Sequence, residues 1–368
     1  MARKLKSDKV LFLATLLLVL ASVVMVYSAS AAMADLKFGN PYLFLVKQGM
    51  WATLGIAIMS IVMRVDYRVW RQPMLIWTAL GFAFLALVAV LFSAPINGTR
   101  RWFGLYGFGI QPSEIAKLAV IFFTAALLER RMSRVNDLKE TLVPLGTVVG
   151  VLTALILLEP DFGTSVCLVV TAGLMLFAAG LSLRYVAVTA GTGLAAGVAL
   201  IAISPYRMKR IGSFLSPEDD PLGSGFQLLQ SLIAVGSGGI DGRGLMGGLQ
   251  KLFYLPEPHT DFIYAVIAEE MGLIGATVIL IAFAAITWRG LRVAARAPDR
   301  FESFLSIGLT GMIAVQAFVN LSVVLGMVPT KGIPLPFVSA GGSSLLINLV
   351  GMGILLNVSQ HASGVHES

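Results

Sequence analysis

The chain has 368 residues, of which 57% are hydrophobic and only 13% are charged. This composition excludes an ordinary soluble domain and indicates a protein that crosses a membrane several times. The formal net charge of +7 is spread through many short segments, so we interpret it as a signal of membrane topology and expect no nucleic-acid partner. The single cysteine, Cys167, lies in an apolar run, which leaves neither a disulfide framework nor a thiolate metal site.

Ten apolar segments have the length and composition expected of membrane-spanning helices. The first follows the basic N-terminal run 1–9 and is longer than the apolar part of a usual signal peptide, so we interpret it as an uncleaved span. The expected spans cover about residues 10–26, 43–63, 73–92, 113–128, 141–157, 164–181, 185–203, 262–288, 304–325 and 343–358. The sequence therefore predicts an all-α polytopic membrane bundle that forms one domain over residues 1–368.

Lysine and arginine residues are concentrated in alternate connections between the expected spans. The basic groups of one side lie in residues 3–9, 64–71, 130–139, 184 and 289–300. Because segments rich in lysine and arginine are retained in the cytoplasm, both termini are expected to be cytoplasmic. The segments that contain Arg100, Asp261 and Lys331 then all face the external side of the membrane.

The longest connection, residues 204–260, separates the seventh and eighth expected spans. It is rich in glycine, and its middle carries the apolar run Leu228–Val235. Such a composition is also found in flexible linkers, but the interleaved apolar side chains can insert into the membrane interface or pack over the bundle. We therefore expect an ordered external loop.

The stretch Lys251–Gly275 leads from a polar, proline-containing approach into a long apolar helix pattern. Pro256 and Pro258 each fix their own φ and bias the preceding residue away from the α region. We therefore expect Glu257 and His259 to lie in extended backbone outside regular helix.

Two interpretations of Asp261 remain open, because the helix is expected to begin near Thr260. An acid in the first turn of a helix is stabilised by the helix dipole and by free backbone N–H groups, so Asp261 can be purely structural. Ionisable groups at membrane depth also tend to mark functional sites. Asp261 shares its short segment with Glu257 and His259, which favours a functional site at the mouth of the span.

Two further motifs carry charge at span ends. Ser113 is a plausible N-cap, and Glu114 and Lys117 fall on one helix face three residues apart, so we expect them to form an ion pair. Lys117 has the alternative of turning its ammonium group towards an anionic ligand. The turn 158–164 contains Glu159 and Asp161, which we interpret as capping or solvated acids.

The last external connection, residues 328–344, contains three prolines, three glycines and the cation Lys331. Irregular backbone at membrane depth is tolerated only where it lines a cavity or is buried in protein. A lone lysine would extend towards the membrane surface, but near an aspartate at a span mouth Lys331 becomes a candidate clamp for an anion.

Motifs over nearly the whole chain resemble those of the SEDS family (shape, elongation, division and sporulation). They lie at residues 26–30, 100–102, 111–114, 159–164, 223–227, 252–262 and 329–332. The intact runs 251–257 and 329–332 are similar to the division branch rather than the elongation branch. The chain departs from the family at Ala340, where a tyrosine is common, so no role for that aromatic ring is carried over.

The resemblance implies a peptidoglycan glycosyltransferase of the bacterial inner membrane that polymerises lipid II during septal cell-wall synthesis. It also implies a class B penicillin-binding transpeptidase and other division proteins as partners. By the same resemblance, Asp261 is the catalytic carboxylate, and Lys117 and Lys331 match positions tied to activity. The expected substrate-binding residues are Lys331, Lys117, Arg100, Arg101, Glu257, His259 and Ser339.

This chemistry needs only one carboxylate base. A diphosphate departs without a general acid, so one base that takes the proton of the acceptor hydroxyl can suffice for an inverting transfer. The charge that develops on the diphosphate calls for cations from the basic residues or for a bound divalent ion, Mg²⁺ or Mn²⁺. The sequence offers no compact metal cage. A lipid II flippase and a non-catalytic division scaffold are the alternative functions.

Overall fold

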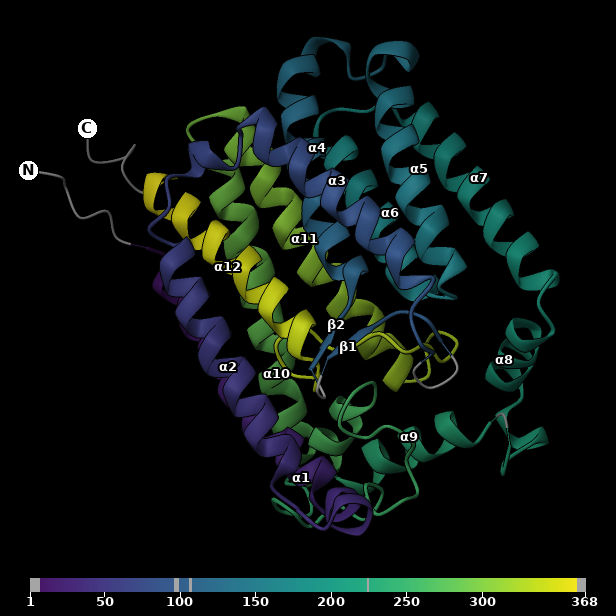
Figure 1. The fold of residues 1–368 in the computed structure, drawn as a ribbon. Helices are drawn as coiled ribbons and strands as arrows, with labels where there is room; N and C mark the ends of the chain where they lie inside the picture. Colours follow the sequence, from purple (N-terminus) through teal and green to yellow (C-terminus); the bar gives the residue numbers. More distant parts are fainter. Residues whose placement is uncertain (1–6, 96–98, 106–107, 224, 363–368) are drawn as a thin grey trace, which may run out of the picture.

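The computed structural model describes residues 7–95, 99–105, 108–223 and 225–362. Figure 1 shows a helical bundle in which the start of α1 and the end of α12 lie on the same side of the molecule, with the α1–α2 connection at the bottom of the view. The long helices are α1 (Lys9–Phe38), α2 (Leu43–Val62), α3 (Pro73–Val90), α4 (Pro112–Arg131), α5 (Val143–Leu158), α6 (Phe162–Ala178), α7 (Leu183–Ala202), α10 (Ile263–Ala295), α11 (Arg300–Val324) and α12 (Gly342–Ala362). The short elements are α8 (Pro205–Leu215), α9 (Phe226–Ser237), the single turns η1 (Tyr67–Val69), η2 (Met132–Arg134), η3 (Leu138–Leu142) and η4 (Pro217–Asp219), and the antiparallel strands β1 (Phe103–Leu105) and β2 (Phe108–Ile110).

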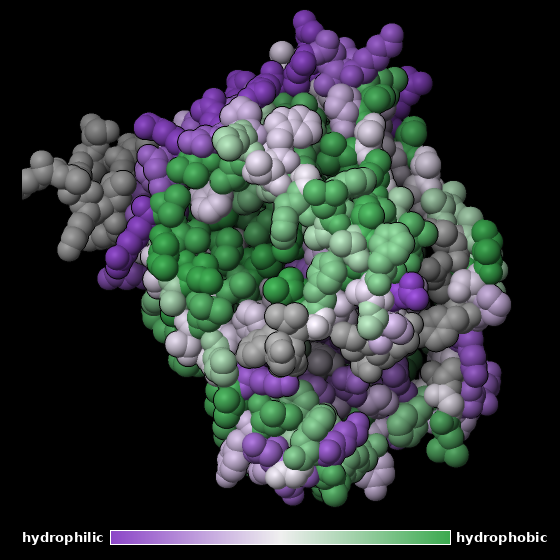
Figure 2. Space-filling model, in the orientation of Figure 1, coloured by the Kyte–Doolittle hydropathy of each residue, from purple (hydrophilic) through white to green (hydrophobic). Residues whose placement is uncertain are grey.

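Each expected span coincides with one of the long helices, which confirms the all-α polytopic class. Within the described residues, seven helices are long and apolar enough to cross a membrane: α1, α2, α3, α5 with the preceding turn η3, α10, α11 and α12. The apolar parts of α6 and α7 are shorter, and α4 carries buried charges. Figure 2 shows a broad hydrophobic belt with hydrophilic side chains above and below it. Ten complete crossings remain a prediction.

Helix α10 is broken at Gly272, whose φ of 62° and ψ of −163° are not helical. The Tyr264 hydroxyl donates a hydrogen bond to the carbonyl of Ala276 at 3.3 Å. In a straight helix these two residues would be separated by about 18 Å along the axis, so the arm Ile263–Met271 turns back against the rest of α10. The prediction of a continuous span over residues 262–288 is therefore wrong. Asp261 lies just before a short helical arm rather than at the end of a full span.

The glycine-rich part of the long connection supplies the hydrogen bonds that this break leaves open. The N–H groups of Leu273 and Ile274 donate to the carbonyls of Gly239 and Ile240, at 2.9 and 3.3 Å. On the other side of the break, the N–H groups of residues 243 and 244 donate to the carbonyls of residues 269 and 270. Helix ends inside a bundle need such partners. This connection, with α8, η4 and α9, is thus ordered in its described residues, while its external position remains a prediction.

Buried charge fixes the same arm to α1. The Glu270 carboxylate accepts hydrogen bonds from the Ser28 hydroxyl at 2.7 Å and from the N–H of Met246 at 3.0 Å. Lys251 Nζ lies 2.5 Å from the same carboxylate. Because Ser28 belongs to α1 while Met246 and Lys251 belong to the long connection, the Glu270 carboxylate holds α1, the long connection and the broken helix together.

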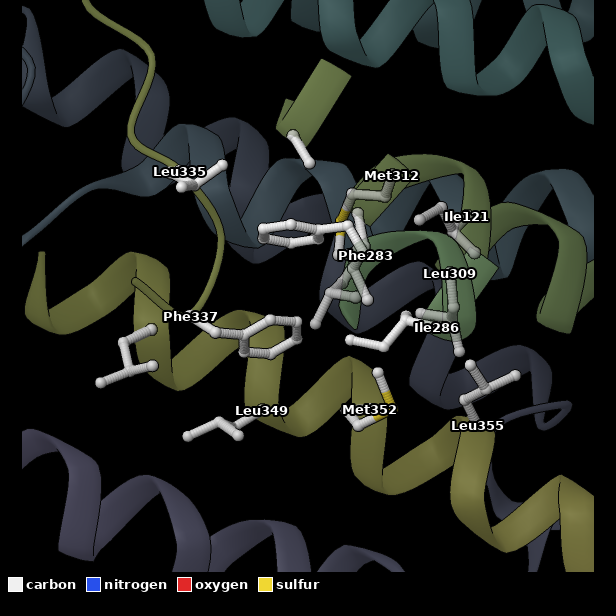
Figure 3. Packing of buried hydrophobic residues seen from close by; sticks show 14 of the residues in the cluster. Ile121, Phe283, Ile286, Leu309, Met312, Leu335, Phe337, Leu349, Met352 and Leu355 are labelled. Carbon is white, nitrogen blue, oxygen red and sulfur yellow. The ribbon is translucent and has the colours of Figure 1, made fainter. Parts of the chain in front are cut away.

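The last connection is anchored in the apolar core. Leu335 and Phe337 are 1% exposed, and Figure 3 shows the Phe337 ring among side chains that include Phe283 of α10 and Leu349 of α12. This burial fixes the part of the connection that follows Lys331. Irregular backbone at membrane depth must line a cavity or be buried in protein, and around Leu335 and Phe337 the connection is buried.

Candidate functional site

A cavity of about 810 Å³ lies where the irregular segments meet. Its wall joins α6, α8, α11, the approach to α10 and the residue Gln111 before α4, which are far apart in the sequence. The ionisable side chains that line it are Arg101, Asp161, Arg210, Glu257, Asp261 and Lys331. Three cations and three acids therefore face one cavity that is partly open.

Asp261 precedes its helix and does not cap it. The helix begins at Ile263 rather than near Thr260, and its N-cap is Phe262, with no side-chain capping bond. A Cβ atom added at Gly332 would lie 2.8 Å from Asp261 Oδ2, so the carboxylate sits against the backbone of the last connection. The capping interpretation of Asp261 thus finds no support, and its side chain faces the cavity.

The surroundings of Asp261 oppose its ionisation. Burial raises the pKa of its carboxyl to about 7, and the negative charge of Glu257 acts in the same direction. The positive charges of Arg210 and Arg101 act against this shift. A carboxyl group whose pKa lies near neutral pH suits a general base.

The turn before Asp261 has an unusual backbone. Glu257 has a φ of +50°, which places it in the left-handed region. The expected extended conformation is therefore wrong for Glu257, although the residue does lie outside regular helix. The Thr260 hydroxyl donates to the carbonyl and the carboxylate of Glu257, each at 3.3 Å. Strained residues of this kind cluster at functional sites, where the surrounding contacts hold them.

The cations at the cavity wall are held by the segments around them. Lys331 Nζ lies 3.7 Å from the ring centroid of Phe162, a cation–π contact. Arg101 donates to the carbonyls of Glu159 and Pro160 at 2.9 and 2.6 Å. Arg210 of α8 donates to the carbonyl of Thr330 at 2.8 Å. These contacts orient the ammonium group of Lys331 and the guanidinium groups of Arg101 and Arg210 towards the cavity.

Sequence reasoning missed Arg210. The only local signal for it is a group of basic residues that follows Pro205 in the long connection. That group identifies no partner, because the approach of α8 to the last connection depends on the fold.

Four expected substrate-binding residues do not line the cavity. Arg100 is exposed and donates to the carbonyl of Leu91 at 3.0 Å. The buried Ser339 hydroxyl donates to the carbonyl of Thr260 at 2.5 Å, so it braces the segment next to Asp261. His259 and Lys117 are also buried away from the cavity.

His259 supports the turn from behind. Its ring lies 4.8 Å from the ring of Phe44 on α2, and burial lowers its pKa. Its backbone carbonyl accepts a hydrogen bond from the N–H of Ala340 at 2.9 Å. A neutral, packed imidazole in this place links α2 to the turn and to the last connection.

The predicted ion pair between Glu114 and Lys117 is confirmed, with Lys117 Nζ 2.9 Å from Glu114 Oε2. The same ammonium group donates to Gln316 Oε1 at 2.7 Å. Gln316 in turn donates to the carbonyl of Pro334 at 2.9 Å. Lys117 therefore acts on the last connection through Gln316, and it does not reach the cavity.

The capping role expected for Asp161 is also confirmed. Its carboxylate accepts from the N–H and the hydroxyl of Thr164, at 3.0 and 2.8 Å, and from the amide of Gln111 at 3.0 Å. Glu159 behaves differently, since its fully buried carboxyl oxygens have no hydrogen-bond partner. Burial, together with the charge of Asp161, raises the pKa of Glu159 to about 8, so it is largely neutral at pH 7.

The acids of the cavity do not form a metal cage by themselves. Among the described residues, no group of three or more His, Cys, Asp or Glu side chains is placed to hold a metal ion. Mg²⁺ is usually bound through one or two carboxylates together with substrate phosphates. The carboxylates of Asp261 and Glu257 would supply the protein ligands of such a site, and the remaining ligands would have to come from the substrate.

The fold and the cavity define a polytopic membrane protein with a charged site enclosed by irregular backbone. Residues 8–364 match the family model of the FtsW, RodA and SpoVE proteins, described as cell cycle proteins. The chain belongs to this family, which is the SEDS family that its motifs predicted.

Individual relatives match over almost the whole chain. Stage V sporulation protein E of Bacillus subtilis (strain 168) is 44% identical over 361 residues, which cover 98% of this chain and 99% of that protein. A protein of Geobacter sp. (strain M18) named "Probable peptidoglycan glycosyltransferase FtsW" is 43% identical, with coverages of 97% and 98%. A chain in the solved structure "Structural coordination of polymerization and crosslinking by a peptidoglycan synthase complex" has a TM-score of 0.79 and 31% identity, with coverages of 97% and 99%.

The buried pair beneath the site gives a stability prediction. Lys117→Met leaves Glu114 as a buried carboxylate without its cation, and breaking a buried pair in this way costs about 3–5 kcal/mol. We expect a lower unfolding temperature in detergent, largely recovered in the double variant Glu114→Gln/Lys117→Met. The exposed Lys37→Met serves as the control. Normal thermal stability of Lys117→Met with weaker ligand binding would instead favour Lys117 as a direct ligand of an anion.

Proposed function

We propose that this protein is a peptidoglycan glycosyltransferase that polymerises lipid II for septal cell-wall synthesis, with Asp261 as its general base. The observation that carries this proposal is the Asp261 carboxyl, which has a pKa near 7 and shares a cavity with Arg101, Arg210 and Lys331. The relatives named as peptidoglycan glycosyltransferases support the reaction class.

In the proposed reaction, Asp261 takes the proton of the acceptor sugar hydroxyl. The hydroxyl oxygen forms a bond to the anomeric carbon of the donor, and the bond from that carbon to the diphosphate breaks with inversion. Undecaprenyl diphosphate leaves with the bonding electrons and without a proton. Arg101, Arg210 and Lys331 stabilise the charge that develops on it, and they are oriented before the reaction by their contacts with the protein.

The cavity also suits a substrate with a lipid chain. Beside its charged side chains, the wall carries the apolar Ile201, Ile211, Phe318 and Val319. A polyprenyl tail must remain in an apolar environment while its sugars and phosphates reach the charged side. The mixed lining supports a lipid-linked donor or acceptor.

We also propose the cellular location, the membrane orientation and the partner proteins. The protein is a multi-pass membrane protein, and we place it in the bacterial inner membrane with both termini cytoplasmic and the cavity external, supported by the distribution of basic residues. We propose a class B penicillin-binding transpeptidase and other division proteins as partners. The similarity to a chain of a peptidoglycan synthase complex supports a partner of this kind.

Cysteine labelling tests this orientation. Asn40 and Lys139 are exposed and lie in connections expected on opposite sides of the membrane, while the native Cys167 is buried and provides a silent background. In intact spheroplasts, a membrane-impermeant maleimide should label Asn40→Cys at once and Lys139→Cys only after lysis. Labelling of both before lysis, or of Lys139→Cys alone, would overturn the topology.

The decisive variant for the reaction is Asp261→Asn, which keeps the size of the side chain and removes the proton acceptor. Purified variant, supplied with lipid II and its transpeptidase partner, should form no glycan polymer yet still bind lipid II, because the proton transfer belongs to the transition state. Asp35→Asn, at an exposed position, should leave polymerisation unchanged. A flippase or a scaffold would form no polymer even as the wild type, and near-normal polymerisation by Asp261→Asn would remove Asp261 from the chemistry.

The pH dependence of polymerisation follows from the shifted carboxyl. Below about pH 7 Asp261 is protonated and cannot accept a proton, so the rate should rise with pH and level off above pH 7. Glu257→Gln removes a charge that raises this pKa, so the rise should move to lower pH; Arg210→Gln should move it to higher pH. Initial rates from pH 5 to 9 measure both effects. An unchanged midpoint in both variants would show that another group controls the profile.

A further inference from the structure

The amide of Asn320 joins the two segments that carry the proposed base and the proposed cation. Its Nδ2 donates to the carbonyl of Asp261 at 2.9 Å and to the carbonyl of Ile333 at 2.7 Å. Asn320 is 1% exposed and lies on α11. Its Oδ1 has no hydrogen-bond partner among the described residues, and turning the amide over would set that oxygen against two carbonyls. The orientation of the amide is therefore fixed by what it binds.

One helical turn earlier, Gln316 repeats this arrangement. Its Nε2 donates to the carbonyl of Pro334, and its Oε1 accepts from Lys117. Gln316 and Asn320 are four residues apart and thus share a face of α11. That face holds the carbonyls of Ile333 and Pro334, which lie just after Lys331.

Neither amide touches the cavity. The residues of α11 that line it are Phe318, Val319 and Ser322, whereas Gln316 and Asn320 are buried behind the backbone that they bind. Contact with a substrate is thus not their role. Their contacts are with main-chain atoms of non-helical segments, which need internal partners at membrane depth.

We propose that Asn320 is a positioning residue that sets the placement of Asp261 relative to the Lys331 segment, with Gln316 and Lys117 bracing the same segment. This inference rests on the proposed function, because it assigns catalytic consequence to that placement. Other contacts, such as Ser339 with the carbonyl of Thr260, also join the two segments. Asn320 differs from them because it binds the carbonyl of Asp261 itself.

The test uses two buried asparagines of one kind. Asn320→Leu removes the shared donor. Asn357→Leu is the matched control, since Asn357 is 3% exposed, donates through Nδ2 to the carbonyl of Met63 in another segment and has an unpartnered Oδ1, yet lies far along α12 from the cavity. Thermal unfolding in detergent, hydrogen–deuterium exchange, and kcat and KM for lipid II polymerisation with the partner present are measured for both variants.

We expect the two variants to lose similar thermal stability. Only Asn320→Leu should speed exchange of the backbone amides in residues 333–340 and lower kcat, by about ten- to a hundredfold, with a smaller change in KM, because small displacements of a reacting group carry penalties of this size.

Three results would overturn the proposal. Unchanged exchange in residues 333–340 would show that the clamp does not hold the segment. Faster exchange with wild-type kcat would show that the clamp is structural only. Equal losses of kcat in Asn320→Leu and Asn357→Leu would assign the effect to general instability. A wild type that forms no polymer refutes the proposed function instead, and the exchange measurement then decides whether the clamp exists.

Discussion

Irregular backbone within a membrane protein must find all its hydrogen-bond partners inside the protein, and the rest of this structure depends on that constraint. The broken helix α10 obtains its partners from residues 239–244. The segments that carry Asp261 and Lys331 obtain partners from buried side chains of α11 and of the last connection. Polar groups are thus placed deep in the bundle chiefly to support the irregular segments, and the cavity exists because those segments replace helix there.

The same enclosure determines the electrostatics of the site. A carboxyl held by protein atoms loses hydration, so the pKa of Asp261 is raised although Arg101 and Arg210 oppose the shift. Burial also raises the pKa of Glu159, to about 8, and Arg101 is bound to the main chain of residues 159 and 160. Because Arg101 is held by neutral carbonyls, its charge is not cancelled by a contacting carboxylate and remains able to act on an anion in the cavity.

The parts of the structure that could be predicted from the sequence are those with local causes. Apolar length predicted the helices, the three-residue spacing predicted the pair of Glu114 and Lys117, and the turn composition predicted the cap at Asp161. The break at Gly272 could not be predicted, because a single glycine in an apolar run also fits a continuous helix. Arg210 and Asn320 were missed because their importance arises from contacts across more than fifty residues of sequence.

Helix α11 explains how two distant segments can form one site with a defined geometry. The proposed base, which directly precedes a short helical arm, and a cation on a separate connection would each move with their own segments if they were anchored independently. Gln316 and Asn320 instead bind both segments to one buried helix, and the apolar Phe337 packs the connection against α10 and α12. A displacement of either segment must therefore break hydrogen bonds to buried carbonyls. That cost supports the proposed placement of Asp261 relative to Lys331, while the open side of the cavity leaves room for the proposed lipid-linked substrate.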